Sequence, residues 1–199
     1  AARAAGYRNA GTIEFILDQN KNYYFIEMNT RIQVEHGVTE LVTGLDLVKE
    51  QIRIASGERV SFSKEDIAIR VHARECRINA ECPERGFMPS PGKVLGLHLP
   101  GGNGVRIDTA LTAGYTMPTM YDSLAAKVMT LGKDRGEAIA KMRGVLSEMV
   151  IDGIETNRQF QLELLSEADF VAGEIDTGFV EEFLKRRMEQ EEETDGQEV

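Results

Sequence analysis

Nine consecutive residues, 27–35, combine side chains that could bind a metal ion or an anion. They read EMNTRIQVE. In an extended strand, successive side chains point to opposite faces. The odd-numbered positions would then place two carboxylates, two carboxamides and a guanidinium on one face: Glu27, Asn29, Arg31, Gln33 and Glu35. A half-buried strand also turns polar groups to water, so a solvated sheet face is the alternative interpretation. The mixture of acid, amide and guanidinium favours a binding site, because wet strand faces are usually richer in Lys, Thr and Ser.

A predicted hairpin places another acidic residue beside this segment. Two runs rich in β-branched and aromatic residues flank the turn-like sequence DQNKN at 18–22. If Asp18 pairs with Tyr23, then Glu14 lies opposite Glu27. Two carboxylates that face each other across a strand pair repel and destabilise the sheet.

A divalent cation between Glu14 and Glu27 would remove that repulsion. Asn29 lies two residues beyond Glu27 and offers a third oxygen donor. Hard oxygen ligands of this kind suit Mg²⁺ or Mn²⁺ held together with phosphate oxygens. A register shifted by one residue would instead put the two acids on opposite faces.

The composition limits the class of protein to which these residues can belong. The chain has 199 residues, 42% hydrophobic and 28% charged, which is typical of a soluble globular protein. Its net charge is −10, and residues 181–199 contribute −5 of it, with eight acidic and three basic residues. With no basic stripe, no apolar run that could cross a bilayer and no signal peptide, we expect a cytoplasmic protein that binds neither nucleic acid nor membrane. We expect Cys76 and Cys82 to be reduced structural thiols.

Hydrophobic periodicity predicts an α+β fold. The predicted elements, in order, are the hairpin, the polar segment 27–35, a helix over 39–57, an extended stretch over 67–80, β segments separated by turns at 89–92 and 100–104, and helices that begin near 134, 156 and 177–178. In the extended stretch, Glu75 and Arg77 continue an apolar face, which indicates a strand that opens onto a cleft or an interface. The alternative is an ion pair, either between Glu75 and Arg77 or with a neighbouring strand. Turn-like residues near 58–66 predict a boundary between two units.

Several longer motifs together resemble the biotin carboxylases, members of the ATP-grasp superfamily. They are EMNTRIQVEH at 27–36, ECRINAE at 75–81, PSPGK at 89–93, YDS at 121–123 and DGI at 152–154. Glu-Met-Asn alone would fit several ATP-grasp ligases, and the run 31–36 narrows the resemblance to biotin-dependent carboxylases. The resemblance implies the C-terminal piece of an ATP-grasp domain (1–62) followed by a biotin carboxylase C-terminal domain (63–188). Residues 189–199, which are acidic and have almost nothing apolar to bury, predict a disordered tail.

The resemblance also implies a reaction and a role for each matching residue. In this family, ATP and bicarbonate form carboxyphosphate, and a carboxyl group is transferred to biotin on a carrier protein, the first half-reaction of acetyl-CoA carboxylase in fatty acid synthesis. The implied metal ligands, for Mg²⁺ or Mn²⁺ with ATP, are Glu14, Glu27 and Asn29. The implied bicarbonate site is Arg31, Gln33 and the backbone of Val34. The implied catalytic residues are Arg31, Glu35 as general base and Arg77, which would stabilise negative charge on the biotin oxygen.

Two departures from the family pattern are visible. Gly37 stands where the family commonly has Pro after His36, which we expect to loosen the turn after the base. The family's glycine-rich phosphate loop and nucleotide-binding lysines lie upstream of this chain, and the chain begins without Met inside an apparent helix end. We therefore expect a fragment that is inactive alone.

The resemblance further implies partners, and it leaves alternatives open. Family members of the acetyl-CoA carboxylase type form homodimers through the C-terminal domain, in a segment that includes Asn103 and Arg106. The other implied partners are a biotin carboxyl carrier protein and a carboxyltransferase subunit. The alternatives are a non-catalytic dimerisation module, the biotin carboxylase part of a propionyl-CoA or pyruvate carboxylase, and a different ATP-grasp ligase, against which the run 31–36 argues.

Overall fold

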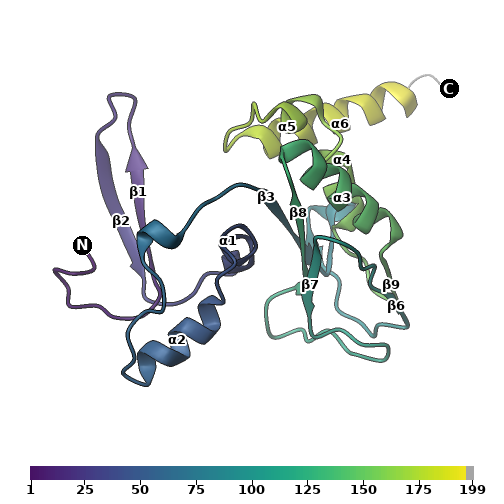
Figure 1. The fold of residues 1–199 in the computed structure, drawn as a ribbon. Helices are drawn as coiled ribbons and strands as arrows, with labels where there is room; N and C mark the ends of the chain where they lie inside the picture. The colour runs from purple at the N-terminus through teal and green to yellow at the C-terminus, as the bar shows by residue number, and fades with distance from the viewer. Residues whose placement is uncertain (196–199) are drawn as a thin grey trace.

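The structure, a computed structural model, describes residues 1–195. A hairpin and two helices form its first part, and a linker with a short 3-10 turn leads to a second part of antiparallel strands and helices (Figure 1). The first part contains β1 (Thr12–Leu17), β2 (Tyr23–Asn29), α1 (His36–Thr43) and α2 (Leu47–Ala55), and the linker contains the 3-10 turn η1 (Lys64–Asp66). The second contains β3 (His72–Asn79), β4 (Glu81–Cys82), η2 (Pro83–Arg85), β5 (Met88–Pro89), β6 (Gly96–His98), β7 (Val105–Thr109), β8 (Leu124–Gly132), α3 (Arg135–Glu148), β9 (Val150–Asp152), α4 (Arg158–Leu164), α5 (Ala168–Ala172) and α6 (Phe179–Asp195). This mixture confirms the α+β class.

Strands β1 and β2 form the predicted hairpin, but the turn takes one more residue than predicted. Leu17 rather than Asp18 pairs with Tyr23. The Asp18 carboxylate instead accepts hydrogen bonds at 2.8 Å from the backbone N–H groups of both Asn20 and Asn22. Asp side chains favour turns because they bond to the backbone in this way.

A β-bulge nevertheless brings the two acidic residues opposite each other. Phe15 pairs with Phe25, but the next pair is Glu14 with Glu27, so Ile26 is an extra residue on β2. An extra residue on one strand changes the register by one. The offset at the turn and the bulge cancel, and the predicted pairing of Glu14 with Glu27 is confirmed.

The single helix predicted over 39–57 is wrong, because the segment forms two helices. Gly44 follows α1 with a φ of 74°, the left-handed conformation that ends helices and that glycine adopts at little steric cost. Asp46 then caps α2, where its carboxylate accepts a hydrogen bond from the Lys49 N–H at 2.8 Å.

The second part is built on a three-stranded sheet with β8 between β3 and β7. Helix α3 packs on one face of this sheet, where buried apolar side chains of strands and helix form the main core, among them Ile78, Val128, Met142 and Leu146. The extended stretch predicted over 67–80 pairs as a strand only from His72, because β8 ends at Gly132, directly opposite His72.

Charged side chains lie on the other face of this sheet. Residues directly opposite each other in an antiparallel pair share a face. Arg77 of β3 lies opposite Lys127 of β8, and Lys127 lies opposite Asp108 of β7. The next row on the same face includes Glu75 and Arg106. Helix α1 lies against this face, between the hairpin and the sheet (Figure 1).

The C-terminal helices pack around a cluster of phenylalanines. Phe160, Phe179 and Phe183 are buried in this cluster. Helix α5 was not predicted, and α6 begins next to the predicted start at 177–178. Helix α6 runs to Asp195, within the range expected to be an acidic tail, and residues 196–199 of that range lie outside the described residues. Within the described part of the chain, no helix is long and apolar enough to cross a membrane.

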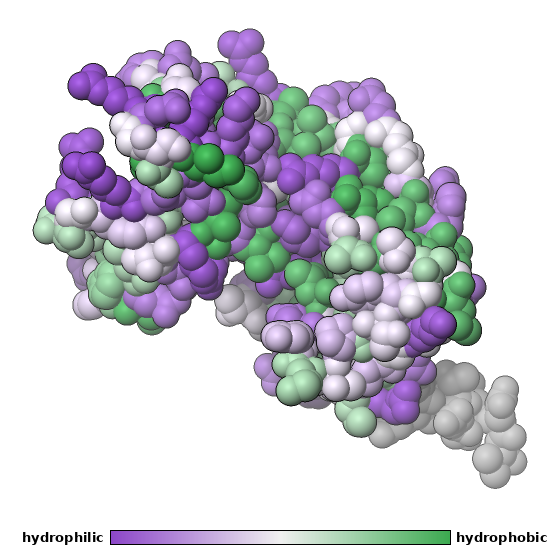
Figure 2. All heavy atoms as spheres, turned by 90° about the horizontal axis from the view of Figure 1, so that it is seen from below, coloured by the Kyte–Doolittle hydropathy of each residue, from purple (hydrophilic) through white to green (hydrophobic). Residues whose placement is uncertain are grey.

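The hairpin exposes more large apolar side chains than the sheet of the second part. Seven of these side chains are between 46% and 72% exposed: Phe15, Ile16, Leu17, Tyr23, Tyr24, Phe25 and Ile26. On the face of the molecule seen in Figure 2, apolar side chains gather in several separate patches between hydrophilic ones.

Candidate functional site

The two carboxylates of the hairpin converge on one atom. The Asn29 Nδ2 group donates to Glu14 Oε1 at 3.0 Å and to Glu27 Oε1 at 2.8 Å. Glu14 comes from β1, whereas Glu27 and Asn29 lie on one face of β2. A single donor group therefore bridges the facing acids and offsets their repulsion.

This donor set fits a hard divalent cation. A cation that took the place of the bridging amide N–H would meet two carboxylate oxygens, and Asn29 also carries a carbonyl oxygen. Among the described residues, no group of three His, Cys, Asp or Glu side chains is arranged to hold a metal ion. The two carboxylates and the amide would thus form part of a coordination shell that phosphate oxygens or water must complete.

Residues 30–35 are not an extended strand, so the prediction of one alternating face over 27–35 is wrong. Strand β2 ends at Asn29, which pairs with Thr12, the first residue of β1. Because β1 begins at this pair, the ladder between the two strands stops there. The chain turns instead, and Glu35 becomes the N-cap residue of α1.

The turn still gathers the predicted anion-binding residues. The Arg31 guanidinium donates to Gln33 Oε1 at 2.6 Å, to the Ile32 carbonyl at 3.2 Å and to Asn29 Oδ1 at 3.2 Å. Arg31, Gln33 and Glu35 line the same cavity of about 270 Å³. The side chains that spacing alone placed on one strand face are thus brought together by a loop.

Glu35 and Arg77 meet although 42 residues separate them. Arg77 Nη2 donates to Glu35 Oε2 at 2.9 Å, and the two side chains are 50% and 57% exposed. Arg77 therefore pairs with Glu35 of the N-terminal part, and within the described residues the internal Glu75–Arg77 ion pair is not formed. The end of β3 is held by Asn157, which donates to the Arg77 carbonyl at 3.2 Å and accepts from the Asn79 N–H at 2.9 Å.

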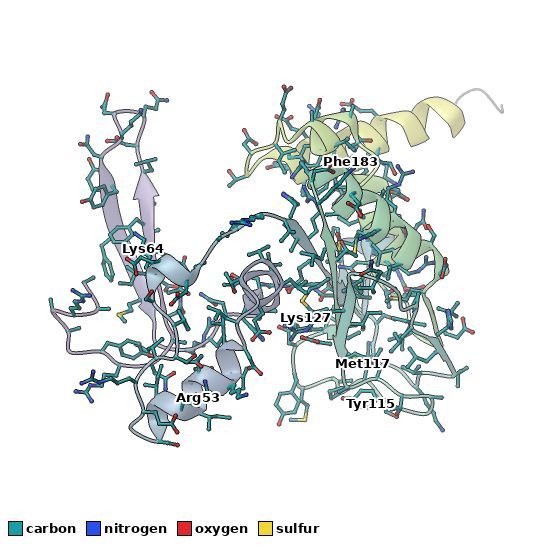
Figure 3. All side chains as sticks on the ribbon, viewed as in Figure 1. Arg53, Lys64, Tyr115, Met117, Lys127 and Phe183 are labelled. Atoms are coloured by element: carbon teal, nitrogen blue, oxygen red, sulfur yellow. The ribbon has the colours of Figure 1, made fainter. Side chains whose placement is uncertain are left out.

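Lys127 is a residue of the site that the sequence patterns did not predict. It is 8% exposed, and its Nζ donates to the Val34 carbonyl at 2.7 Å. Figure 3 places Lys127 on the side of the sheet that faces the N-terminal part. The signal in the sequence is one charged residue in the otherwise uncharged run at 124–132.

A second ionic contact joins the two parts of the chain. Arg106 donates to Glu40 of α1 at 2.6 Å and to both carboxylate oxygens of Asp108 at 2.9 Å. The hydrogen bonds from Arg106 lower the pKa of the Asp108 carboxyl below its ordinary value. Arg106, which was expected in a dimer contact, thus has its charge neutralised within its own chain.

Glu75 faces the same side of the sheet but lacks a partner among the described residues. Neither of its buried carboxylate oxygens makes a hydrogen bond in the described structure. Burial raises the pKa of this carboxyl above its ordinary value, although the positive charges of Lys127 and Arg77 act to lower it.

Gly37 of α1 lies next to Glu75, and the Met129 sulfur fills the space where a Cβ at residue 37 would lie. Gly37 is buried and packed, which corrects the expectation of a loosened turn.

Known proteins match both parts of the chain. The family model described as "Biotin carboxylase C-terminal domain" matches residues 75–182, and that described as "Carbamoyl-phosphate synthase L chain, ATP binding domain" matches residues 1–63. Biotin carboxylase 1 of Bacillus subtilis is 57% identical over 184 residues, which are 92% of this chain and 41% of that protein. One subunit of the pyruvate carboxylase of Methanothermobacter thermautotrophicus is 51% identical over 185 residues, which are 93% of this chain and 38% of that protein. The chain thus spans 38–41% of the length of these relatives.

A solved structure has the same fold. The biotin carboxylase domain dimer of 2-oxoglutarate carboxylase from Hydrogenobacter thermophilus, in complex with MgADP, ADP and bicarbonate, superposes with a TM-score of 0.87 at 46% identity. The match covers 91% of this chain and 40% of that chain. With the C-terminal domain model matched over 75–182, more than half of the 199 residues, the chain belongs to the biotin carboxylase family.

Proposed function

We propose that this chain carries one wall of the active site of an ATP-dependent biotin carboxylase, a ligase that forms a C–N bond. The reaction transfers the γ-phosphoryl group of ATP to bicarbonate, which gives carboxyphosphate and ADP. The carboxyl group then passes to biotin on a carrier protein, and inorganic phosphate is released. The observation that carries the proposal is the meeting of Arg31, Gln33 and Glu35 at one cavity, with Arg77 bonded to Glu35. A related domain from Hydrogenobacter thermophilus binds MgADP and bicarbonate, which supports the same substrates here.

Arg31, Gln33 and the Val34 backbone bind bicarbonate in this proposal. A planar guanidinium matches a planar carboxylate-like anion through two parallel hydrogen bonds and stays charged at any working pH. Arg31 is already oriented by Gln33 and Asn29, so little side-chain freedom is lost when the anion binds.

Glu35 acts as the general base. Bicarbonate is a weak nucleophile until it loses its proton, and a carboxylate within hydrogen-bond reach can take that proton. Glu35 follows the anion-binding residues directly in the chain and lines their cavity. Its bond to Arg77 fixes the direction of the carboxylate.

Arg77 stabilises the negative charge that develops on the biotin ureido oxygen. A fixed cation aimed at an enolate-like oxygen lowers the barrier, because little reorganisation is needed during the reaction. Glu35 and Asn157 hold the side chain and the backbone of Arg77 respectively.

Glu14, Glu27 and Asn29 are the residues that would hold Mg²⁺ or Mn²⁺. When bound, such a cation neutralises charge on the ATP phosphates. Both carboxylates already point to one bridging group, so they need little rearrangement to share a ligand.

The whole enzyme would work as a homodimer, together with a carboxyltransferase subunit and a biotin carboxyl carrier protein. The relative from Hydrogenobacter thermophilus is a dimer, which supports the first of these. Relatives named for pyruvate and 2-oxoglutarate carboxylases share this part of the chain, so the proposal concerns the half-reaction on biotin.

Phosphate release by the full-length enzyme that carries these residues tests the proposal. Release by the wild type should require both bicarbonate and biotin. Glu35→Gln should slow it by roughly 10²–10⁴-fold, the usual contribution of a general base. Glu155→Gln is the matched control, because Glu155 is 53% exposed and also pairs with one arginine, Arg85, at 2.6 Å. Phosphate release that needs neither bicarbonate nor biotin, or full activity in Glu35→Gln, would contradict the proposal.

A further inference from the structure

Lys127 is a buried cation whose shorter polar contact is with the N-terminal part of the chain, not with its own sheet. Lysine is seldom buried unless its ammonium group is paired. Lys127 is 8% exposed, and its Nζ donates to the Val34 carbonyl at 2.7 Å, 93 residues away in the chain. Asp108 lies farther off, with its Oδ2 at 3.7 Å from the Nζ.

The contact fixes one particular peptide unit. The Val34 carbonyl belongs to the planar unit that joins Val34 to Glu35. A bond to this oxygen therefore restricts the orientation of the whole unit, including the backbone from which the Glu35 side chain projects. The preceding residue, Gln33, is held separately by Arg31 at 2.6 Å.

Two neighbouring strands hold two successive residues of the loop. Lys127 and Arg77 lie directly opposite each other in the β3–β8 pair, on one face of the sheet. Lys127 holds Val34, and Arg77 holds Glu35 at 2.9 Å. Because the strands are rigidly paired, the sheet imposes a fixed spacing on these two loop residues.

We propose that Lys127 is a positioning residue that sets the orientation of the Glu35 base and of the bicarbonate site around Val34. The inference rests on the proposed function. Asp108 of β7 lies opposite Lys127 of β8 and is held by Arg106 of its own strand. Its carboxylate offsets the cost of burying the Lys127 charge.

Steady-state kinetics of the full-length enzyme test this role. Lys127→Met keeps the length and apolar stem of the side chain but leaves the Val34 carbonyl without its donor. We expect kcat/KM for bicarbonate to fall roughly 10- to 100-fold, as misplacement of a reacting group does, while the KM for ATP stays unchanged. Lys127→Arg retains a charged donor and should recover part of the loss.

Lys141→Met is the matched control. Lys141 also donates from a partly buried side chain to a backbone carbonyl of the same strand, Leu131 at 2.8 Å, but away from the loop. Its loss should lower stability without changing kcat/KM for bicarbonate. Equal effects of Lys127→Met and Lys141→Met, or no recovery in Lys127→Arg, would overturn the positioning role.

Crystal structures of the full-length wild type and Lys127→Met separate this inference from the proposed function. We expect the Val34–Glu35 peptide to rotate and the Arg77–Glu35 bond to open in the variant. An unchanged loop refutes the inference even if the enzyme proves active. An inactive wild type whose loop moves in the variant refutes the proposed function and keeps the structural role of Lys127.

Discussion

Asn29 illustrates how the identity of one side chain settles a local electrostatic problem. A bridging amide N–H offsets the repulsion between Glu14 and Glu27, at 3.0 and 2.8 Å. The same amide group accepts a bond from Arg31 through its oxygen. An aspartate here could accept from Arg31 but could not donate to the two acids. The carboxamide therefore connects the acid pair to Arg31, the arginine proposed to bind the anion.

Glu75 presents the opposite situation, a buried carboxylate that lacks hydrogen-bond partners among the described residues. Burial raises its pKa above the ordinary value of 4.5. A group whose pKa is higher in the folded than in the unfolded state stabilises the fold below the unfolded value, and this stabilisation is lost as the pH rises. Above 4.5, the ionised side chain therefore lowers the free energy of unfolding relative to a neutral one.

We predict that Glu75→Gln raises the melting temperature at neutral pH, because the amide carries no charge to desolvate. The gain should shrink as the pH falls toward 4.5 and be lost below it, where glutamate is protonated in both the folded and the unfolded state. Thermal unfolding of the full-length protein across this pH range measures the effect.

Glu137→Gln provides a control of opposite sign. Hydrogen bonds from the Lys133 N–H and the Lys141 side chain lower the pKa of Glu137, so its stabilisation is present above its ordinary pKa and is lost on acidification. Glu137→Gln should lower the melting temperature at neutral pH. If Glu75→Gln lowers the melting temperature at neutral pH, as Glu137→Gln should, the assigned burial of Glu75 is wrong.

At the scale of elements, the break between α1 and α2 depends on one backbone conformation. Gly44 has a φ of 74°, and no atom would lie within 4 Å of a Cβ at this position. Gly144, in the middle of α3, likewise has open space around it but has an ordinary helical φ. Packing restricts neither position, so a comparison of the two isolates the effect of the left-handed backbone at Gly44.

We predict opposite effects for the two Gly→Ala substitutions. Gly44→Ala should lower the free energy of unfolding by about 1 kcal/mol, because alanine is strained in the left-handed region. Gly144→Ala should raise it by about 0.5–1 kcal/mol, because alanine restricts the unfolded chain and favours the helix. Urea unfolding of the two variants measures both. A stabilising Gly44→Ala would contradict the helix break described above.

Local sequence signals predicted these elements to different degrees. The hairpin followed from turn composition, and the Glu14–Glu27 pair was predicted correctly from a register that is wrong at the turn. The bulge at Ile26 carries no local signal, because it depends on the whole strand pair. The break at Gly44 and Asp46 did have signals, glycine and an N-cap residue, but apolar periodicity on both sides masked them.

At the scale of the whole molecule, the site exists because two separate parts dock. Three basic residues of the sheet each bond to one residue of the N-terminal part. The pairs are Arg106 with Glu40, Lys127 with Val34, and Arg77 with Glu35. Spacing along the chain could not predict these contacts, because they join segments 42 to 93 residues apart. The resemblance to the family supplied Arg77 as a site residue. The contacts of Lys127 and Glu40 with the other part were visible only in the folded chain.

The Arg77–Glu35 contact makes the central prediction, since it unites the proposed base with the proposed biotin-binding cation. The decisive measurement is the transfer of radiolabelled bicarbonate to free biotin by the full-length enzyme with Arg77→Ala. We expect transfer to fall by roughly 10²–10³-fold, the usual effect of removing one charge-stabilising group. Arg85→Ala, which removes the exposed Arg85–Glu155 pair, should leave it unchanged. Undiminished transfer to biotin in Arg77→Ala would contradict the assignment of this site.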